Sequence, residues 1–215
     1  MKLRIGIGTL VAAVALAGGF ACKKQGEEAA SGGGGGQGAA TEPAAAGPAL
    51  AEKELAFGKV KFKVSVPADW EEKIETGSFA SARYTTKDFR YSLAFDETCC
   101  GMCEAEKWAD NVKAEAAQYA SGEMFQPPVT VEVKENGEVA PGAWVFVGHT
   151  APVDPATGAR SQALLKVWRY GADWEQIVTC EFSVDRDDAE GLALLESLRN
   201  ACLGLERLGP AQPAS

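Results

Sequence analysis

The sequence contains one histidine, His149, and has fewer basic than acidic residues. An enzyme with a Ser-His-Asp or Cys-His mechanism would have to use that single imidazole. His149 follows an alternation of apolar residues, which favours a position at the rim of a sheet over a catalytic role. The chain has 21 Lys and Arg residues and 30 Asp and Glu residues, so its formal net charge is -9. Because nucleic-acid binding depends on Lys and Arg at the phosphates, this charge opposes a nucleic-acid partner.

The N-terminus has no apolar run long enough to cross a bilayer. Its apolar run, residues 5–17, has 13 residues, whereas a membrane-spanning helix needs about 20. Lys2 and Arg4 precede the run and small residues follow it, so residues 1–21 are typical of a secretory signal peptide. Their removal takes away two basic residues and no acid, which brings the net charge to about -11 and opposes electrostatic binding to anionic lipid headgroups.

The leader ends in Gly19-Phe20-Ala21-Cys22. Cys22 resembles the modified cysteine of the bacterial lipoprotein lipobox, which implies that it becomes the first residue of the mature chain and is acylated. Each buried CH₂ of an acyl chain contributes about 0.8 kcal/mol to anchoring. Lys23 stands where an Asp resembles an inner-membrane retention signal, so the resemblance favours the outer membrane, facing the periplasm or the cell surface. Gly19-Phe20-Ala21 also satisfies the small-x-small rule of an ordinary signal peptidase, and the alternative is a soluble exported protein.

Residues 22–52 contain one leucine and no aromatic residue. A stretch so rich in Gly, Ala and Pro cannot bury enough apolar surface to offset its ordering entropy, which predicts a flexible linker. The Gly-rich residues 32–36 are not expected to bind phosphate, because no strand precedes them and no helix follows them. Residues 53–208 are long enough for one domain with a core, and residues 209–215 are predicted to be a disordered tail.

The domain alternates between strand and helix periodicities. Residues 59–66 alternate as a half-buried strand, whose three lysines we interpret as protection of a sheet edge. A hairpin around Lys87-Asp88 follows, and then a helix over residues 104–120. Strands are predicted over residues 129–133, 143–150, 161–170 and 174–182, the last two covered on both faces, before a final helix that Asp185 caps. The apolar helix stripes comprise Trp108, Val112, Ala116 and Tyr119, and then Leu192, Leu195, Leu198 and Cys202.

This order contains no βαβ alternation. We therefore predict the α+β class: an antiparallel sheet of about six to seven strands with two main helices packed on it. The order resembles the PsbP-like fold, which includes DcrB-type bacterial lipoproteins. The resemblance rests on the opening FKVSVPADW, residues 62–70, and on the leucine spacing of the closing helix. It implies a domain used for binding and assembly and not for catalysis.

Five cysteines follow Cys22, and an exported chain is expected to form disulfides. We expect no bond between Cys180, near the end of the strand over 174–182, and Cys202, near the far end of the last helix. Seventeen helical residues rise about 25 Å, whereas bonded cysteines have Cα atoms about 4.4–6.8 Å apart. The cluster at residues 99–103 is expected to supply the partners. The five candidates are Cys99, Cys100, Cys103, Cys180 and Cys202.

The segment Cys100-Gly101-Met102-Cys103 lies between a strand and a helix, as thioredoxin-type redox pairs do. The acidic Glu97, Glu104 and Glu106 oppose a thiolate there, so we favour structural disulfides. A zinc site would need reduced ligands, and neither a metal nor a cofactor is expected.

The sequence thus predicts a membrane-anchored envelope lipoprotein whose domain binds a protein partner or a small ligand without catalysis. The alternative is a thiol-disulfide or metal-binding protein that uses the cluster from Cys99 to Cys103.

Overall fold

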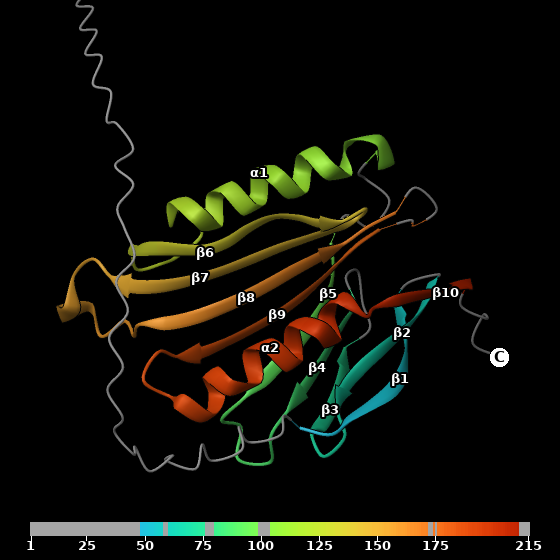
Figure 1. Ribbon diagram of the computed structural model, residues 1–215, viewed down its shortest axis with the longest axis horizontal. Coiled ribbons are helices and arrows are strands. Elements are labelled where there is room, and N and C mark those ends of the chain that lie inside the picture. Colours follow the sequence, from blue (N-terminus) through green and yellow to red (C-terminus); the bar gives the residue numbers. More distant parts are fainter. Residues whose placement is uncertain are drawn as a thin grey trace, which may run out of the picture. The chain divides into compact units, whose positions relative to one another are not determined.

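The computed structural model describes residues 48–57, 60–75, 80–98, 104–171, 174 and 176–210. Within these ranges the chain forms two α-helices and two antiparallel sheets (Figure 1), which confirms the α+β class. None of the helices in these ranges is long and apolar enough to cross a membrane. The strands are β1 (Leu50–Phe57), β2 (Val60–Pro67), β3 (Glu71–Glu75), β4 (Ser81–Thr85), β5 (Ser92–Thr98), β6 (Val129–Ala140), β7 (Ala143–Pro152), β8 (Gln162–Arg169), β9 (Ile177–Asp185) and β10 (Glu206–Pro210). The helices are η1 (Ala105–Lys107), α1 (Trp108–Ser121), η2 (Pro155–Thr157) and α2 (Ala189–Leu203).

The larger sheet has seven strands in the order β3-β4-β5-β9-β8-β7-β6. The four strands from β6 to β9 form the predicted meander, and β5 pairs with β9 in an antiparallel register that aligns Leu93 with Phe182. Strand β8 is buried along almost its whole length. The prediction that this strand is covered on both faces is confirmed, because its alternate side chains face opposite layers.

Helices α1 and α2 cover opposite faces of the larger sheet. Lys166 and Trp168 on β8 hydrogen-bond to Tyr119 and Glu115 of α1. Leu165, which alternation directs to the other face, lines a small pocket with residues of α2. In Figure 1, α1 lies along β6 and β7, and α2 lies against β9.

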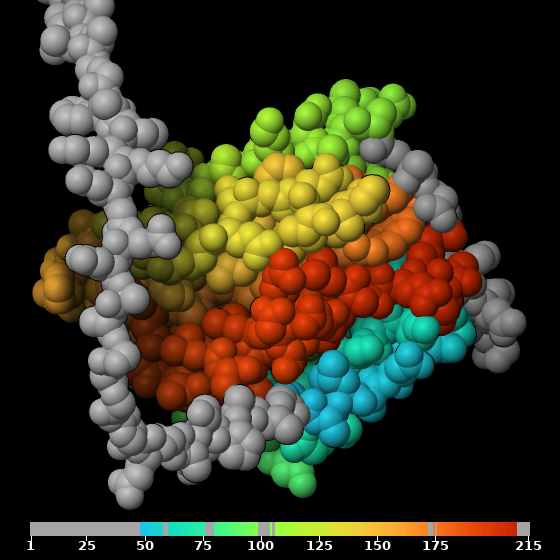
Figure 2. Space-filling model, in the orientation of Figure 1, coloured from blue at the N-terminus to red at the C-terminus, as the bar shows by residue number. Residues whose placement is uncertain are grey.

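The smaller sheet has the order β1-β2-β10 and packs on the α2 side of the molecule. Phe62 of β2 contacts Phe57 of β1 and Trp174, with ring centroids 5.9 and 5.2 Å apart. All three side chains are buried, and they continue the core formed by Phe95, Phe182 and Leu198. Figure 2 shows α2 and the smaller sheet side by side on this surface.

The structure contradicts the interpretation of Lys61 and Lys63 as edge protection, and the third lysine of that prediction, Lys59, lies outside the described residues. β2 is the central strand of its sheet, between β1 and β10. Lys61 lies 3.4 Å from Glu54 of β1, and Lys63 lies 2.9 Å from Glu206 of β10. These lysines therefore form cross-strand ion pairs on the outer surface of the sheet.

The buried stripe of α1 was predicted well and that of α2 only in part, because Leu198 and Cys202 are buried but Leu192 and Leu195 are half-buried. The cap of the last helix was predicted wrongly. Trp108, Val112 and Ala116 are the buried residues of α1, as predicted. Gly122 ends α1 in the left-handed region (φ 85°), where an added Cβ would meet the carbonyl oxygen of Val129 at 2.7 Å. The cap of α2 is Asp188, whose side chain accepts a hydrogen bond from the N–H of Gly191; β9 continues through the predicted cap, Asp185.

Candidate functional site: a groove at the end of the larger sheet

The two C-terminal cysteines bond to each other, contrary to expectation. Cys180 and Cys202 are fully buried, with Cα atoms 5.7 Å apart. The prediction was wrong because it ended the strand at residue 182, whereas β9 extends to Asp185 and leaves Cys180 near its beginning. From Cys180 the strand advances about 3.3 Å per residue, and α2 returns at about 1.5 Å per residue over more residues. The distance covered along β9 and the distance covered in return along α2 are nearly equal, so Cys202 lies beside Cys180.

The remaining cysteines lie outside the described residues. These are Cys22, interpreted as the lipid-bearing residue, and the cluster of Cys99, Cys100 and Cys103. Their pairing therefore stays a prediction. The disulfide that is seen removes Cys180 and Cys202 from the possible partners of the cluster.

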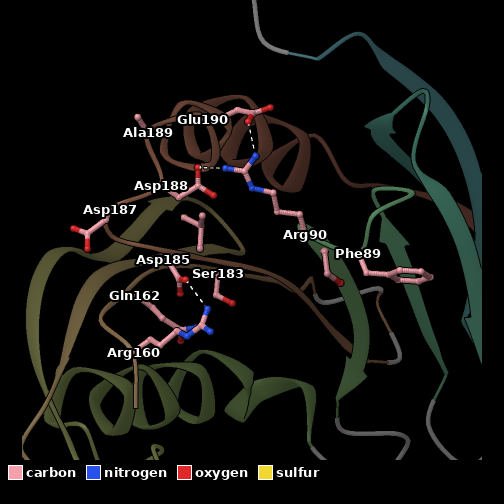
Figure 3. Close-up of a pocket in the computed structure, with 12 residues that line it drawn as sticks. Phe89, Arg90, Arg160, Gln162, Ser183, Asp185, Asp187, Asp188, Ala189 and Glu190 are labelled. Atoms are coloured by element: carbon pink, nitrogen blue, oxygen red, sulfur yellow. Dashed lines mark hydrogen bonds and ion pairs between the residues drawn. The ribbon is translucent and has the colours of Figure 1, made fainter. Parts of the chain in front are cut away.

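A groove of about 970 Å³ lies where the β4–β5 hairpin, the ends of β8 and β9 and the first turn of α2 meet. We call it the sheet-end groove (Figure 3). Its polar floor comes from side chains of neighbouring strands, because β5 pairs with β9 and β9 pairs with β8. The lining residues are Phe89, Arg90, Ser92, Arg160, Gln162, Ser183, Val184, Asp185, Asp187, Asp188, Ala189 and Glu190.

Two arginines of the groove are each held by carboxylates (Figure 3). Arg90 of the hairpin turn donates to Asp188 at 2.8 Å and to Glu190 at 2.7 Å, and so connects the β4–β5 hairpin to the first turn of α2. Arg160, before β8, donates to Asp185 at 2.9 Å. The lining thus holds four carboxylates against two guanidinium groups, a surplus of two negative charges. The groove is acidic even after its own ion pairs are formed.

Asp188 joins three segments of the chain. Besides Arg90, its carboxylate accepts hydrogen bonds from the Tyr91 hydroxyl at 3.0 Å and from the backbone N–H of Gly191 at 3.1 Å. The Gly191 N–H, then the Tyr91 hydroxyl and Arg90, hold the pKa of Asp188 below its ordinary value. Burial, together with this carboxylate, raises the pKa of Tyr91 to about 12. The contact area between the hairpin and α2 is therefore fixed by charge-assisted bonds.

Phe89 stands at the hairpin side of the groove in an unusual backbone conformation. Its N–H donates to the carbonyl of Thr86 at 2.8 Å, closing a tight turn, and its φ is 58°. It is the only non-glycine residue with a positive φ in the described part of the chain. Its side chain is 75% exposed, more than any other large apolar side chain described. Figure 3 shows the ring pointing away from the ion pairs of the groove.

A second polar cluster lies under α1. Lys166 of β8 is only 8% exposed, and its Nζ lies 2.8 Å from the Tyr119 hydroxyl, 3.2 Å from Glu181 and 3.3 Å from Glu115. Burial lowers the pKa of Lys166, but Glu181, Tyr119 and Glu115 outweigh it and the net shift is upward. Because every partner is on β9 or α1, this ammonium group joins the helix to the sheet.

His149 lies on β7, with Nδ1 3.8 Å from Glu132 of the neighbouring strand. Burial, then the charges of Arg186 and Lys134, lowers the pKa of His149. The histidine does not line the sheet-end groove. Within the described residues, no three side chains of the His, Cys, Asp or Glu type gather to hold a metal ion.

No local sequence pattern predicted the sheet-end groove. Arg90 and Glu190 are 100 residues apart in the chain, and only the pairing of β5 with β9 brings them together. One local signal was available, because the segment Thr85-Thr86-Lys87-Asp88-Phe89-Arg90 places the bulky Phe89 where such turns favour Gly. A comparison with protein-family models finds no matching family, and a comparison with curated proteins finds no match either.

Proposed function

We propose that this chain is an exported protein, held at the outer membrane through acylated Cys22, whose domain binds a partner without catalysing a reaction. The observation that carries the proposal is the buried Cys180–Cys202 disulfide. Structural disulfides form and persist in oxidising compartments outside the cytoplasm and are rare inside it. The leader with its terminal Cys22 supports the same location independently.

The binding role is supported by the sheet-end groove and by Phe89 at its side. A large open groove with charged walls, next to a highly exposed aromatic side chain, is typical of an interaction surface. The proposed PsbP-like relationship agrees with such a role. Its support is the order of the elements, from the FKVSVPADW opening in β2 to the leucine-spaced helix α2.

Acyl labelling in a bacterial host tests the anchor. With radioactive palmitate, the full chain is expected to take up label and to sediment with membranes, and Cys22→Ala is expected to lose both properties. Cys180→Ala/Cys202→Ala is the matched control, because it removes cysteines that carry no lipid in this proposal and leaves no unpaired thiol from their bond. Equal labelling of the wild-type chain and Cys22→Ala would reject the anchor.

One observation favours a second candidate, thiol-disulfide chemistry at the cluster of Cys99, Cys100 and Cys103. Since Cys180 and Cys202 bond to each other, the cluster has only its own members and Cys22 as partners within the chain. Brief alkylation of the folded protein followed by peptide mass mapping tests this candidate. Rapid modification of Cys100 or Cys103 would favour it, and slow modification of the whole cluster would reject it.

A further inference from the structure

We propose that the sheet-end groove, with Phe89 beside it, docks a basic segment of a partner protein and packs an apolar side chain of that segment against the Phe89 ring. The inference rests on the proposed binding function and adds the surface and the chemistry of the partner. Three observations carry it: the exposure of Phe89, its backbone conformation and the charge balance of the groove.

The conformation of Phe89 is energetically unfavourable, and the isolated domain gains no compensating burial from it. A φ of 58° suits Gly or Asn, and a bulky side chain is disfavoured there. The ring is 75% exposed and so gains little burial in return. The next most exposed large apolar side chain, Val153 at 61%, is not at a positive φ. A residue that costs backbone energy and leaves an aromatic ring in water is explained by a contact that forms on docking.

The surplus negative charge of the groove favours a positively charged partner over a negatively charged one. Arg90 and Arg160 are already held by Asp188, Glu190 and Asp185 at 2.7–2.9 Å. An incoming anion would have to displace these carboxylates. An incoming Lys or Arg instead meets the surplus negative charge, to which Asp187 contributes from an exposed position.

The cations next to the groove do not line it. Arg83 donates to Ser92 of the lining at 3.4 Å, but its own charge acts on Asp96 and Glu75. Arg186 follows Asp185 in the chain but does not line the groove, and its charge acts on His149 and Glu132 of the meander. The carboxylates of the groove are spread over the end of β9 and the first turn of α2, and they do not gather as metal ligands do. An extended segment with several cationic side chains matches this spread better than a single small cation.

Fluorescence polarisation with defined peptides tests the proposal. The probe is a fluorescein-labelled nine-residue peptide in which Lys alternates with Gly around one central Leu. Two matched peptides replace every Lys by Glu, or the Leu by Gly. The protein is the full-length mature chain in neutral detergent. Phe89→Gly keeps the turn conformation and removes the ring, and Ile74→Thr is the control because it removes another exposed apolar side chain, on β3.

We expect the Lys-Leu peptide to bind saturably, and to bind less tightly as salt is raised. Phe89→Gly should weaken this binding about tenfold, and the weakening should largely vanish with the peptide that lacks Leu. Asp187→Asn should weaken binding about threefold through the lost charge, and Ile74→Thr should leave it unchanged. Should Phe89→Gly melt far below wild type, Phe89→Asn takes its place, since Asn also accepts a positive φ.

Three results would overturn the proposal: no saturable binding of the Lys-Leu peptide, tighter binding of the Glu peptide, or equal affinity of Phe89→Gly for the Lys-Leu peptide. None of these results depends on acylation of Cys22. A chain that takes up palmitate but fails this test keeps its anchor and loses only this partner chemistry.

Discussion

At the scale of single residues, Asp188 stabilises the folded domain, whereas Phe89 has a conformation that is unfavourable in the free domain. Asp188 satisfies the first turn of α2 through the N–H of Gly191 and also binds Tyr91 and Arg90, so its three contacts all favour the folded state. Phe89 has a costly φ and an exposed ring. Both residues line the sheet-end groove, so its wall at Asp188 is held by hydrogen bonds while its edge at Phe89 is an exposed aromatic ring.

Asp188→Asn is expected to reduce stability at neutral pH and to flatten its dependence on pH in acid. The pKa of Asp188 is lowered in the folded state, so its contribution is present above the ordinary value of 3.8 and is lost as pH falls through the lower folded-state value. Urea midpoints between pH 6 and pH 2 measure this effect. The neighbouring Asp187→Asn is the control and should follow the wild-type curve, because Asp187 is exposed. Parallel curves for Asp188→Asn and wild type would contradict the assignment.

Phe89→Gly is expected to leave the free energy of unfolding unchanged or to raise it by up to about 1 kcal/mol. Relief of the left-handed conformation favours the variant, and the greater entropy of Gly in the unfolded chain offsets part of that gain. Lys87→Gly, in the same turn but without a positive φ, should instead lose about 0.5–1 kcal/mol. Urea unfolding of both variants checks the contrast, and a clear loss for Phe89→Gly would show that the ring stabilises the free domain.

At the scale of elements, a disulfide and a buried ammonium group are among the contacts that hold the helices to the larger sheet. The Cys180–Cys202 disulfide fixes the end of α2 to β9, with a sequence separation of 22. On the opposite face, Lys166 fixes α1 through Glu115 and Tyr119. One connection is covalent and the other ionic, so they respond to different conditions.

Loss of the disulfide in Cys180→Ala/Cys202→Ala is expected to cost about 3 kcal/mol. The value follows from the loop-closure entropy of a 22-residue separation in the unfolded chain. Urea unfolding of the variant, compared with wild type, measures the cost, and reductant should destabilise wild type far more than the variant. A variant as stable as wild type would show that the bond adds nothing to the fold.

Lys166→Met is expected to cost about 2 kcal/mol at neutral pH, because it leaves Glu181 and Glu115 without their shared cation. The folded-state pKa of Lys166 is raised, so its contribution is full below the ordinary value of 10.5 and is lost as pH rises through the higher folded-state value. The variant should therefore lose less stability than wild type above about pH 10.5. Lys113→Met, on the exposed side of α1, should stay within about 0.5 kcal/mol of wild type. An equal effect of the two substitutions would contradict the bridging role.

The elements that the sequence predicted are those with an apolar period. The meander and the stripe of α1 follow from Trp108, Val112 and Ala116 and from alternating strands. β1 was missed, and it begins at Leu50 inside the stretch predicted as a linker, because only Leu55 and Phe57 of its eight side chains are buried. β3 was missed because all five of its side chains are exposed. β10 was missed because it contains Gly209 and Pro210, which usually end order. The groove depends on the pairing of β5 with β9, and the disulfide depends on the relative lengths of β9 and α2. No local sequence pattern contains either kind of information.

At the scale of the whole molecule, the account joins three features. The leader ends at Cys22, a Gly- and Ala-rich stretch follows, and the domain has a buried disulfide and an acidic groove. The leader and the disulfide support the proposed location outside the cytoplasm, and the groove supports the proposed binding of a partner. The net charge of about -11 that remains without residues 1–21 agrees with contact through specific basic partners and not through anionic surfaces.

The intact mass of the protein purified from bacterial membranes, taken after alkylation of free thiols, tests the central claim most directly. The account predicts a chain that begins at Cys22, carries the added mass of acyl chains and leaves Cys180 and Cys202 unalkylated. A chain that begins at Met1, or one that carries an unmodified Cys22, would contradict it.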